Sequence, residues 1–520
     1  MRPLFFLSLL LMNFQIIAQN QYPEISNLSA QFDNTSQVLT VSYDLFDAEG
    51  ESMLVSFLVS DDNGESYLLD TQNATGDLGS AIQSGTGKTI SWDVSTAVPG
   101  AGDYKIKLVA DDLFQIDIQS IVDQVDSNQL LSNLQFMEGI RHRTVGPDLL
   151  EATKDSIEQR FITAGLQTTR QDFPFGTFTG QNIIGRREGM TQSDTTYIVD
   201  AHFDTVNDSP GADDNGSGVA GVMEALRVLA PYRFAKTLRF IGFDLEEEGL
   251  LGSFDFVDNN IGDSETIKGV FNMEMIGYYT EEPNSQEFPT GFEILYPDVQ
   301  ADLVADEFRG NFITNIGDQN SLALMAAYNS AAAQYVPDLK TVSIAAPANW
   351  PGITPDLGRS DHAPFWLQDI PALMLTDGSN FRNPFYHSPN DLLTTLDFTF
   401  MTNVVKAVVG AVAEEAGIQH STMATADFSV AVGLKNTLDC AVQLSPVPAK
   451  DFLSLKFGTC NMQSLDLQVV DILGNTLLSK SITANDINQF QLDLRNWEAG
   501  IYFLNLSDGK RELSRKFIVE

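Results

Sequence analysis

Apolar and polar positions alternate in short runs at both ends of the chain. The runs fill residues 21–116 and 428–520, Gly, Asn and Asp turns separate them, and neither part has a helical period. Alternation with a period of two is typical of strands with one buried face. The pattern therefore predicts an N-terminal β-sandwich at 21–116 and a second, C-terminal β-sandwich at 428–520.

The pattern changes between these two parts, over residues 125–417. Tyr197–Val199 and Thr237–Phe243 are short apolar runs that suit buried strands. The residues between them have apolar positions at helical spacing: Val219, Val222, Met223, Leu226 and Leu229. Strand, helix and strand in succession imply parallel pairing. The central part is therefore predicted to be an α/β domain, with a mostly parallel sheet flanked by helices.

The N-terminus has the form of a signal peptide. Arg2 precedes an apolar run, Leu4–Met12, which continues to Ile17 and Ala18. This run is too short to span a bilayer, so we expect residues 1–19 to be removed near Ala18 or Gln19. No other segment is long and apolar enough to predict a membrane span.

The net charge narrows the choice of partner, and the cysteines predict a disulfide. The chain has 30 Lys plus Arg against 70 Asp plus Glu, a formal net charge of −40. Such a balance argues against nucleic acid or an anionic membrane as partner. Its two cysteines, Cys440 and Cys460, both fall in the last β-domain, where an exported protein is expected to form one disulfide.

Acidic and imidazole side chains follow both central strands. His202 and Asp204 come after the first strand, and three glutamates, Glu246–Glu248, come after the second. Sites in open α/β sheets lie at the carboxyl ends of the strands, so these groups should converge. Converging carboxylates repel one another unless a cation joins them. Zinc accepts both ligand types, and a zinc pair needs a bridging carboxylate.

Six motifs in this order identify a family resemblance. They are His202-Phe203-Asp204, Asp213 to Gly218, Glu246 to Ser253, Asn272 to Gly277, Ser360-Asp361-His362 and Tyr386-His387. Over about residues 125–415 the chain resembles the co-catalytic zinc exopeptidases of the bacterial leucyl aminopeptidase and glutamate carboxypeptidase type. The tail resembles the C-terminal sorting domain of the type IX secretion system, through Pro446-Val447-Pro448, Ala499-Gly500-Ile501-Tyr502 and Lys516-Phe517-Ile518-Val519.

The resemblance implies a ligand set for two Zn²⁺ ions. One ion would be held by Asp213, Glu247 and His387, and the other by His202, Asp213 and Glu274, with Asp213 bridging. The family often has Asp where this chain has Glu274. We therefore expect the second zinc to bind more loosely or to be exchangeable.

The same resemblance implies roles for the neighbouring residues. Glu246 would be the general base that activates water. Asp204 would orient the His202 ring. The remaining motif residues are expected to shape the pocket without binding metal: Ser360, Asp361, His362 and Tyr386.

The predicted function is a secreted, zinc-dependent exopeptidase, an aminopeptidase exported through the periplasm to the exterior or the cell surface. Its expected partners are peptide substrates and the secretion machinery. The N-terminal sandwich, of immunoglobulin or fibronectin type III kind, is expected to be a spacer or a substrate-presenting module. Three alternatives remain: a carboxypeptidase using Arg359, a single-zinc glutaminyl cyclase, and a binding or adhesion protein without catalysis.

Overall fold

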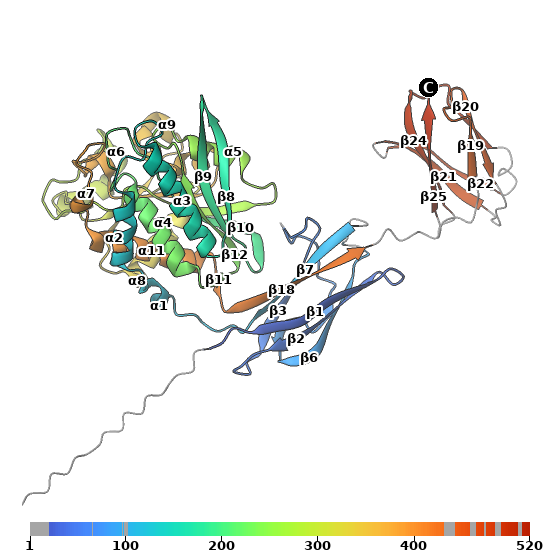
Figure 1. The fold of residues 1–520 in the computed structure, drawn as a ribbon, viewed down its shortest axis with the longest axis horizontal. Helices are drawn as coiled ribbons and strands as arrows, with labels where there is room; N and C mark the ends of the chain where they lie inside the picture. Colours follow the sequence, from blue (N-terminus) through green and yellow to red (C-terminus); the bar gives the residue numbers. More distant parts are fainter. Residues whose placement is uncertain are drawn as a thin grey trace, which may run out of the picture. The chain divides into compact units, whose positions relative to one another are not determined.

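The computed structural model describes residues 20–64, 66–95, 97, 102–430, 442–457, 464–472, 475–483, 490–507 and 512–520 (Figure 1). The predicted signal peptide and both cysteines lie outside the described residues. The chain divides into two compact units, one of residues 1–30, 40–92 and 105–426 and one of residues 31–39, 93–104 and 427–520.

The N-terminal part folds into strands, as the alternating pattern predicts. Its elements are β1 (Glu24–Asp33), β2 (Val38–Phe46), β3 (Met53–Ser60), β4 (Thr75–Gly76), β5 (Gly79–Ile82), β6 (Gly85–Asp93) and β7 (Gly102–Asp111). One sheet has the order β1-β2-β6-β4. Strand β3 belongs to a second sheet. The ring of its Phe57 meets the ring of Trp92 in β6 edge to face, 5.8 Å apart, so the two sheets pack on each other. The alternating pattern also predicts a strand at Tyr67–Leu69, but the structure has no strand there.

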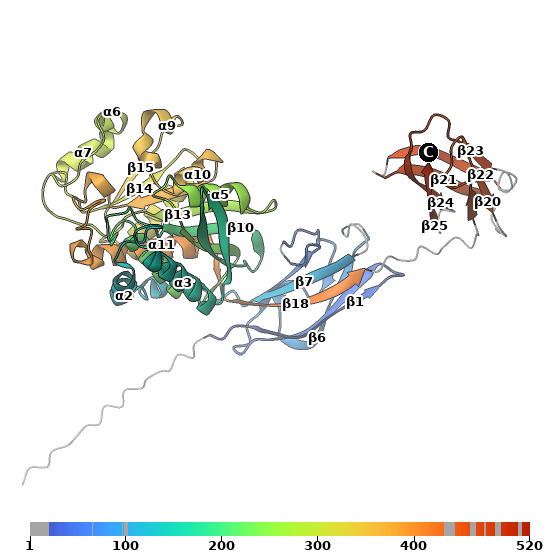
Figure 2. The ribbon, with the colours of Figure 1, turned by 45° about the horizontal axis from the view of Figure 1, so that its top comes forward.

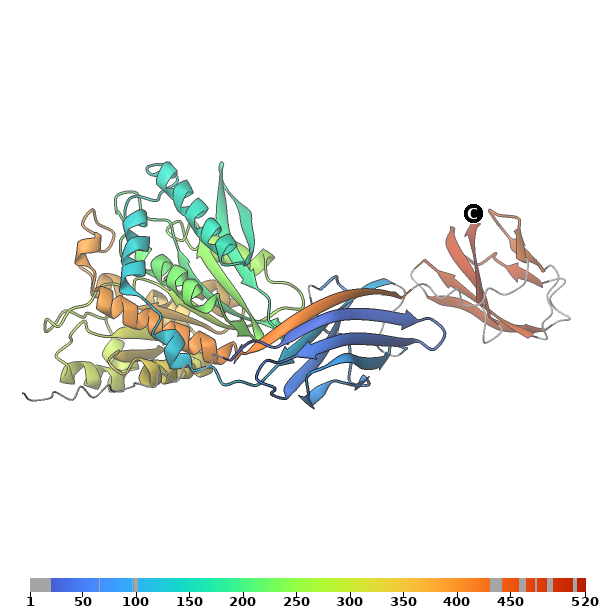
Figure 3. The same ribbon diagram turned by 60° about the horizontal axis from the view of Figure 1, so that its bottom comes forward.

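The second N-terminal sheet contains a strand from much later in the chain. Its order is β18-β7-β3-β5, and β18 covers Ser421–Val430 (Figure 3). The α/β part is therefore inserted between two adjacent strands of one sheet. The predicted start of the C-terminal β-sandwich, residue 428, falls inside β18.

An eight-stranded sheet forms the centre of the α/β part, in the order β15-β14-β16-β13-β10-β12-β9-β8 (Figure 2). Its strands are β8 (Gln167–Phe175), β9 (Phe178–Arg187), β10 (Gln192–His202), β12 (Lys236–Phe243), β13 (Thr266–Met273), β14 (Ile313–Gly317), β15 (Thr341–Ala345) and β16 (Ala372–Thr376). Strands β12, β10, β13 and β16 are parallel to one another, whereas β9 and β14 pair antiparallel with their neighbours β12 and β16. The mixed sheet confirms the α/β centre of the predicted fold class, and its outer strands depart from the mostly parallel pairing that was expected.

Helices cover both faces of this sheet. Successive residues of its strands point to opposite faces, and each face packs into a core of its own. Val199 of β10 belongs to one core and Ile198 to the other. The first core contains residues of α2 (Ser127–Met137), α3 (Pro147–Thr163), α4 (Gly216–Leu229), α8 (Leu322–Tyr335) and α11 (Phe398–Glu415). The second contains residues of α5 (Leu251–Asn259), α6 (Phe292–Leu295), α7 (Pro297–Ala305) and α10 (His362–Leu367). No helix of the described residues is long and apolar enough to cross a membrane.

Shorter elements connect these layers. They are α1 (Ile118–Val122), α9 (Trp350–Ile353), the 3₁₀ turns Pro355–Gly358, Ser379–Phe381 and Leu393–Thr395, and the paired strands β11 (Arg233–Phe234) and β17 (Ile418–Gln419).

The C-terminal part is β-rich, as predicted. Its strands are β19 (Val442–Ser445), β20 (Phe452–Phe457), β21 (Ser464–Asp471), β22 (Thr476–Thr483), β23 (Phe490–Asp493), β24 (Gly500–Ser507) and β25 (Glu512–Val519). They form sheets with the orders β19-β20-β23 and β22-β21-β24-β25. Leu453, Leu467 and Phe517 lie in their common core. This part therefore has a core of its own.

Candidate metal centre

The sheet register places His202 beside the acidic loop that follows β12. His202 is the last residue of β10 and pairs with Phe243, the last residue of β12. Glu246 and Glu247 follow β12 by a few residues, and Glu274 directly follows β13 on the other side of β10. Because β12, β10 and β13 are parallel neighbours, their carboxyl ends bring these side chains together.

Two groups of side chains that could hold a metal ion form at this edge. The first is His202, Glu246 and Glu274, and the second is Asp214, Glu247 and His387. Within each group one ligand atom from every residue lies within 4.8 Å of the others. His202 Nε2 is 3.2 Å from Glu274 Oε2, and His387 Nε2 is 3.3 Å from Glu247 Oε2.

Asp214 belongs to the second group and also faces the histidine of the first. Its Oδ1 is 3.5 Å from His202 Nε2, and its Oδ2 is 3.0 Å from His387 Nε2. The sequence prediction put Asp213 in this place, and the structure contradicts that position. Asp213 turns the other way: its Oδ1 accepts the Gly277 N–H and its Oδ2 accepts a hydrogen bond from Asn383. Adjacent residues of a loop point in different directions, and here the second of the two acids faces the histidines.

The carboxylate of Asp391 fixes the direction of this loop. Its oxygens accept the backbone N–H groups of Asp213, at 2.9 Å, and of Asp214, at 3.1 Å. Asp391 is fully buried, and burial raises its pKa to about 7. With both backbone N–H groups held on one side, the two side chains are directed apart. The sequence prediction did not identify Asp391 as a site residue.

Asn215 connects the same loop to β13. Its Oδ1 accepts the N–H of Gly218, which caps α4, and also the N–H of Met275. Its Nδ2 donates to Glu274 Oε2 at 3.2 Å. A Cβ at Gly218 would lie 2.3 Å from the Met273 carbonyl, so only glycine allows this close approach. The Asp-Asp-Asn-Gly-Ser-Gly motif thus holds a helix start against the strand that carries Glu274.

Ser360 supports the same oxygen of Glu274. Its hydroxyl donates to Glu274 Oε2 at 2.7 Å. Its neighbours in the motif are also buried. His362 places its Nε2 2.8 Å from the Leu357 carbonyl and its ring edge-on to Trp366, and burial lowers its pKa to about 4. Asp361 is fully buried, and burial raises its pKa to about 7.

Asp204 holds the glutamate turn in place. Its two oxygens accept the N–H groups of Glu246, at 3.0 Å, and Glu247, at 3.2 Å, and its Oδ1 is 3.4 Å from His202 Nδ1. Glu246 lies farther from His202 Nε2, at 3.9 Å, than Glu274 does. Glu248 is not part of either group and forms an ion pair with Arg143.

A fully buried arginine, Arg141, stabilises the loop that follows His202. Its guanidinium donates to the carbonyls of Phe203, at 2.7 Å, and Gly211, at 2.9 Å, while burial lowers its pKa to about 10. Its backbone pairs with Thr205 in both directions. Sequence reasoning did not find this role, because an Arg that binds backbone carbonyls leaves no motif.

The centre concentrates more negative charge than the protein alone neutralises. Burial raises the pKa of Glu246 well above its usual value and that of Glu247 to about 7, with the Asp214 carboxylate adding to the second shift. Burial lowers the pKa of His387, but Asp214 and Glu247 outweigh it and raise that pKa to about 10. A protein would hold these groups together as ions only around a cation.

The donor set suits zinc. Nitrogen and carboxylate oxygen are both zinc ligands, and the two groups share Asp214 as a potential bridge. Two buried atoms here, although close to charged groups, lack a hydrogen bond of good geometry within the described residues: Glu247 Oε1 and His387 Nε2. A buried polar atom without a partner is costly, so this arrangement fits a bound metal.

The backbone is strained beside the metal-ligating residues. Leu245, Met275 and His387 have positive φ angles of 58°, 51° and 51°, although none is glycine. Leu245 precedes Glu246, and Met275 follows Glu274. Such conformations persist where the surrounding structure determines them, and they concentrate at functional sites.

A cavity of about 340 Å³ opens from the centre. Asp214, Glu246, Glu247, Glu274 and His387 form its acidic end. Much of the remaining lining is apolar, with Phe288, Phe292, Ile316, Ile344, Leu357 and Met374 among its residues. Tyr386 also lines it, with its ring stacked on His387 at 3.8 Å. The predicted residues Ser360, Asp361 and His362 are not part of the lining.

Comparisons with known proteins show which families this chain resembles. The model of peptidase family M28 matches residues 182–412, and a secretion system C-terminal sorting domain matches residues 443–520. The uncharacterized protein YfbL of Escherichia coli is 32% identical over 276 residues, which cover 50% of this chain and 79% of YfbL. Aminopeptidase YwaD of Bacillus subtilis is 42% identical over 120 residues, or 22% of this chain and 26% of YwaD.

Solved structures of aminopeptidases are also similar. LapA aminopeptidase of Legionella pneumophila has a TM-score of 0.44 and 22% identity, covering 58% of this chain and 78% of its own. The zinc aminopeptidase BSAP of Bacillus subtilis has a TM-score of 0.35 and 27% identity, covering 46% and 51%. The sorting domain indicates export to the cell surface or the exterior. By its family model and its similarity to YfbL, the chain belongs to peptidase family M28, whose members include zinc-dependent exopeptidases, and it carries a C-terminal domain for export.

Proposed function

We propose that the protein is an exported aminopeptidase that binds two zinc ions. The observation that carries this proposal is the position of Asp214, whose two oxygens face the two histidines. One zinc would be held by Asp214, Glu247 and His387, and the other by His202, Asp214 and Glu274. When bound, such a pair supplies Lewis-acid chemistry, polarising the scissile carbonyl and making water a better nucleophile near neutral pH.

Glu246 is the general base in this proposal. It lines the cavity, its N–H is fixed by Asp204, and it lies farther from His202 than Glu274 does. It takes the proton from the attacking water and passes it to the leaving amine. Asp204 keeps the glutamate turn and the His202 ring in place, while Ser360 and Asn215 orient Glu274.

The cavity favours a substrate with a free amino terminus. A positively charged ammonium group is attracted to the carboxylates at the acidic end, while the apolar lining suits an aliphatic or aromatic first side chain. An N-acylated peptide lacks that charge. The enzyme should therefore prefer free-amine peptides that begin with Leu, Met or Phe.

The zinc bound by Glu274 is expected to be the more exchangeable of the two. Glu274 stands where related enzymes often have Asp, and its longer side chain relies on Ser360 and Asn215 for orientation. Zinc content should fall from about two ions per chain to about one during mild dialysis, with the ion at His202 leaving first.

We further propose the order of parts along the chain. Residues 1–19 form a signal peptide, the sandwich is of immunoglobulin or fibronectin type III kind, and the peptidase part covers about 125–417. The position of β18 in the sheet β18-β7-β3-β5 adds residues 421–430 to the sandwich, so that the sorting domain begins after them.

One observation favours a carboxypeptidase as second candidate. Arg359 lines the cavity, and its guanidinium donates to Asn380 Oδ1 at 2.9 Å and to the Tyr386 hydroxyl at 3.1 Å. A positive charge in this position could pair with a substrate carboxylate. An aminopeptidase does not need this contact.

A substrate panel separates the candidates. The purified zinc enzyme is given free-amine peptides, the same peptides N-acetylated, and a peptide beginning with Gln. Release of the first residue from the free-amine peptides alone supports the proposal. Release of the last residue from acetylated peptides, abolished in Arg359→Ala, would replace it with the carboxypeptidase. Cyclisation of the Gln peptide without cleavage would identify a glutaminyl cyclase, and no turnover of any peptide would favour a binding protein.

A further inference from the structure

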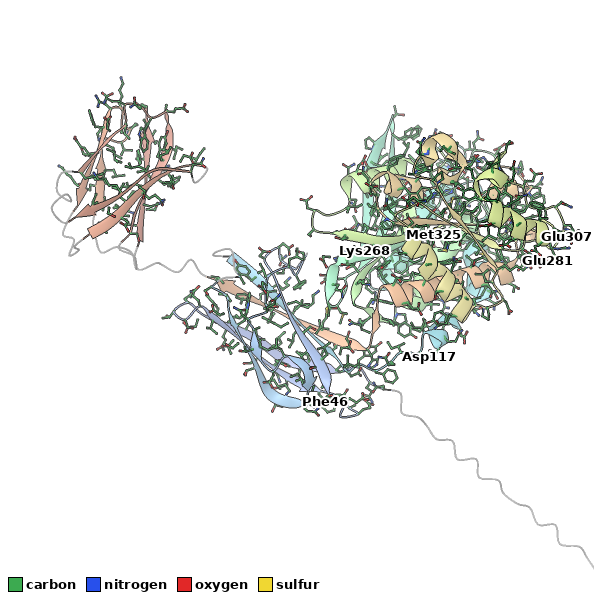
Figure 4. The ribbon with its side chains drawn as sticks, turned by 180° about the vertical axis from the view of Figure 1, so that it is seen from behind. Phe46, Asp117, Lys268, Glu281, Glu307 and Met325 are labelled. Atoms are coloured by element: carbon green, nitrogen blue, oxygen red, sulfur yellow. The ribbon has the colours of Figure 1, made fainter. Side chains whose placement is uncertain are left out.

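A second group of carboxylates lies in the N-terminal sheets, away from the metal centre. Asp47 follows Phe46, the last residue of β2, which is labelled in Figure 4. Glu51 lies in the same turn, before β3, and Asp112 directly follows β7. One carboxylate oxygen from each lies within 4.8 Å of the others. All three residues belong to the same compact unit.

Two buried oxygen atoms in or beside this group have no hydrogen-bond donor among the described residues. Asp47 is only 3% exposed; its Oδ1 accepts the Glu51 N–H at 2.7 Å, whereas its Oδ2 is buried without a partner among the described residues. Asn20 Nδ2 donates to Asp112 Oδ2 at 2.9 Å and to Glu51 Oε2 at 3.4 Å, and Asn20 Oδ1 is likewise buried without a partner. A half turn of the Asn20 amide would direct Oδ1 at the same carboxylates.

The side chains of the protein supply little positive charge to this group, and removal of residues 1–19 would add only the α-ammonium of Asn20. His420 forms an ion pair with Asp112, its Nδ1 lying 2.6 Å from Oδ2, and its ring is stacked on Tyr22 at 4.0 Å. Within the described ranges no Lys or Arg forms an ion pair with any of the three carboxylates. Glu49, which accepts the Gln21 N–H at 3.4 Å, adds a further negative charge nearby.

We propose that Asp47, Glu51 and Asp112, together with the Asn20 amide oxygen, bind a calcium ion. The available donors are oxygens, the ligands that Ca²⁺ takes in sets of about six to eight, with water completing the shell. Zinc prefers imidazole and thiolate, which suits the metal centre instead. The Asp47 Oδ2 atom gains the partner that the protein does not provide, and Asn20 Oδ1 becomes a ligand in place of the two hydrogen bonds that Nδ2 donates.

The ion would connect three segments of the chain. These are Asn20 ahead of β1, the turn between β2 and β3, and the end of β7, from which the chain continues to α1. Asp117, the residue ahead of α1, is labelled in Figure 4. Sites of this kind in extracellular domains bind Ca²⁺ with Kd of about 10⁻⁴–10⁻³ M, which suits an exported protein.

Calcium binding to the zinc-loaded mature chain, residues 20–520, tests the proposal. Equilibrium dialysis with radioactive Ca²⁺ should show one site with Kd of about 0.1–1 mM, and saturating Ca²⁺ should raise Tm by a few degrees. Mg²⁺ at the same concentration should have little effect, because it requires a tighter octahedral shell. Absence of bound Ca²⁺, or an equal Tm rise with Mg²⁺, would overturn the assignment.

Two variants and a matched control locate the site. Asp47→Asn keeps an acceptor for the Glu51 N–H but removes charge, and Glu51→Gln changes an exposed side chain. Each should weaken Ca²⁺ binding at least about tenfold. In Ca²⁺-free buffer Asp47→Asn should melt no lower than the wild type, because one repelling charge is gone. Asp61→Asn, an exposed acid just after β3, should bind Ca²⁺ like the wild type. Unchanged affinity in Asp47→Asn and Glu51→Gln, or equal weakening in Asp61→Asn, would refute the site.

Discussion

Two clusters of carboxylate side chains in this chain differ in the ligand atoms that accompany the carboxylates. The metal centre combines its carboxylates with the imidazoles of His202 and His387, and the N-terminal group presents oxygens from Asp47, Glu51 and Asp112. In the second group the imidazole of His420 lies beside Asp112 as an ion-pair partner. Acidic residues alone do not identify the cation. The atoms that accompany them do, and here they select zinc in one place and calcium in the other.

The two groups also differ in how they are supported. Parallel strands β10, β12 and β13 deliver the metal-centre residues, and Asp204, Asn215 and Asp391 fix them by hydrogen bonds. The N-terminal group lies on turns and strand ends. A rigid site suits catalysis, which depends on fixed geometry, whereas adaptable oxygen ligands suit a structural calcium ion.

The strongest contrast should appear with a zinc chelator. In 1,10-phenanthroline, whose nitrogen donors prefer zinc, peptide hydrolysis should be lost entirely, while the rise in Tm caused by Ca²⁺ should persist. Activity and melting temperature are measured on the same samples, and added zinc should restore activity. Full activity in the chelator would contradict the zinc assignment.

Replacing the proposed base comes next in size. Glu246→Gln keeps the shape of the side chain but cannot accept a proton, so kcat should fall by about 10²- to 10⁴-fold while zinc content is retained. Glu248→Gln is the matched control, because Glu248 pairs with Arg143 instead of lining the cavity. It should retain nearly wild-type kcat. Zinc loss in Glu246→Gln would show that Glu246 is a ligand.

A smaller effect should follow from loosening the Asp213–Asp214 loop. Asp391 accepts two backbone N–H groups, whereas Asn at this position accepts one, so Asp391→Asn should lower zinc affinity by about 10- to 100-fold. Activity should recover at high zinc concentration. Asn390→Ala, an exposed neighbour, serves as the control and should match the wild type. An Asp391→Asn enzyme with unchanged zinc affinity would remove this positioning role.

Removing the tail should have the least effect on catalysis. A chain ending at Val430 keeps β18 in its sheet and should retain kcat/KM within about twofold, since the peptidase part has its own core. In the native host it should accumulate in the periplasm instead of outside. A chain ending at His420 lacks β18 and should melt at a lower temperature. Normal export of the Val430 chain would refute the sorting role.

Much of this arrangement could be predicted from sequence, because motifs and periodicity are local. The strands ending at Val199 and Phe243 and the helix between them follow from apolar spacing, and the six motifs mark the residues that meet at the strand ends. The tail strands are confirmed for the same reason. The chain alternates there, and each strand buries one face.

The remaining features depend on contacts between distant residues. Asp213 and Asp214 are adjacent and chemically identical, and the choice between them is made by Asp391 and Asn383, about 170 residues later. Strand β18 alternates like any tail strand, and only its pairing with β7 assigns it to the N-terminal sheets. Asp47 and Asp112 each look like ordinary turn acids in the sequence. Their proximity appears only in the fold.

The most direct test compares Asp214→Asn with Asp213→Asn. Both substitutions remove one charge from the same loop, and zinc content and kcat/KM are measured for each. Asp214→Asn should retain at most one zinc and lose nearly all activity, because its carboxylate faces both histidines. Asp213→Asn should keep about two zinc ions and most of its activity, because Asn can still accept the Gly277 N–H and loses only the acceptor for Asn383. The reverse pattern would contradict the account.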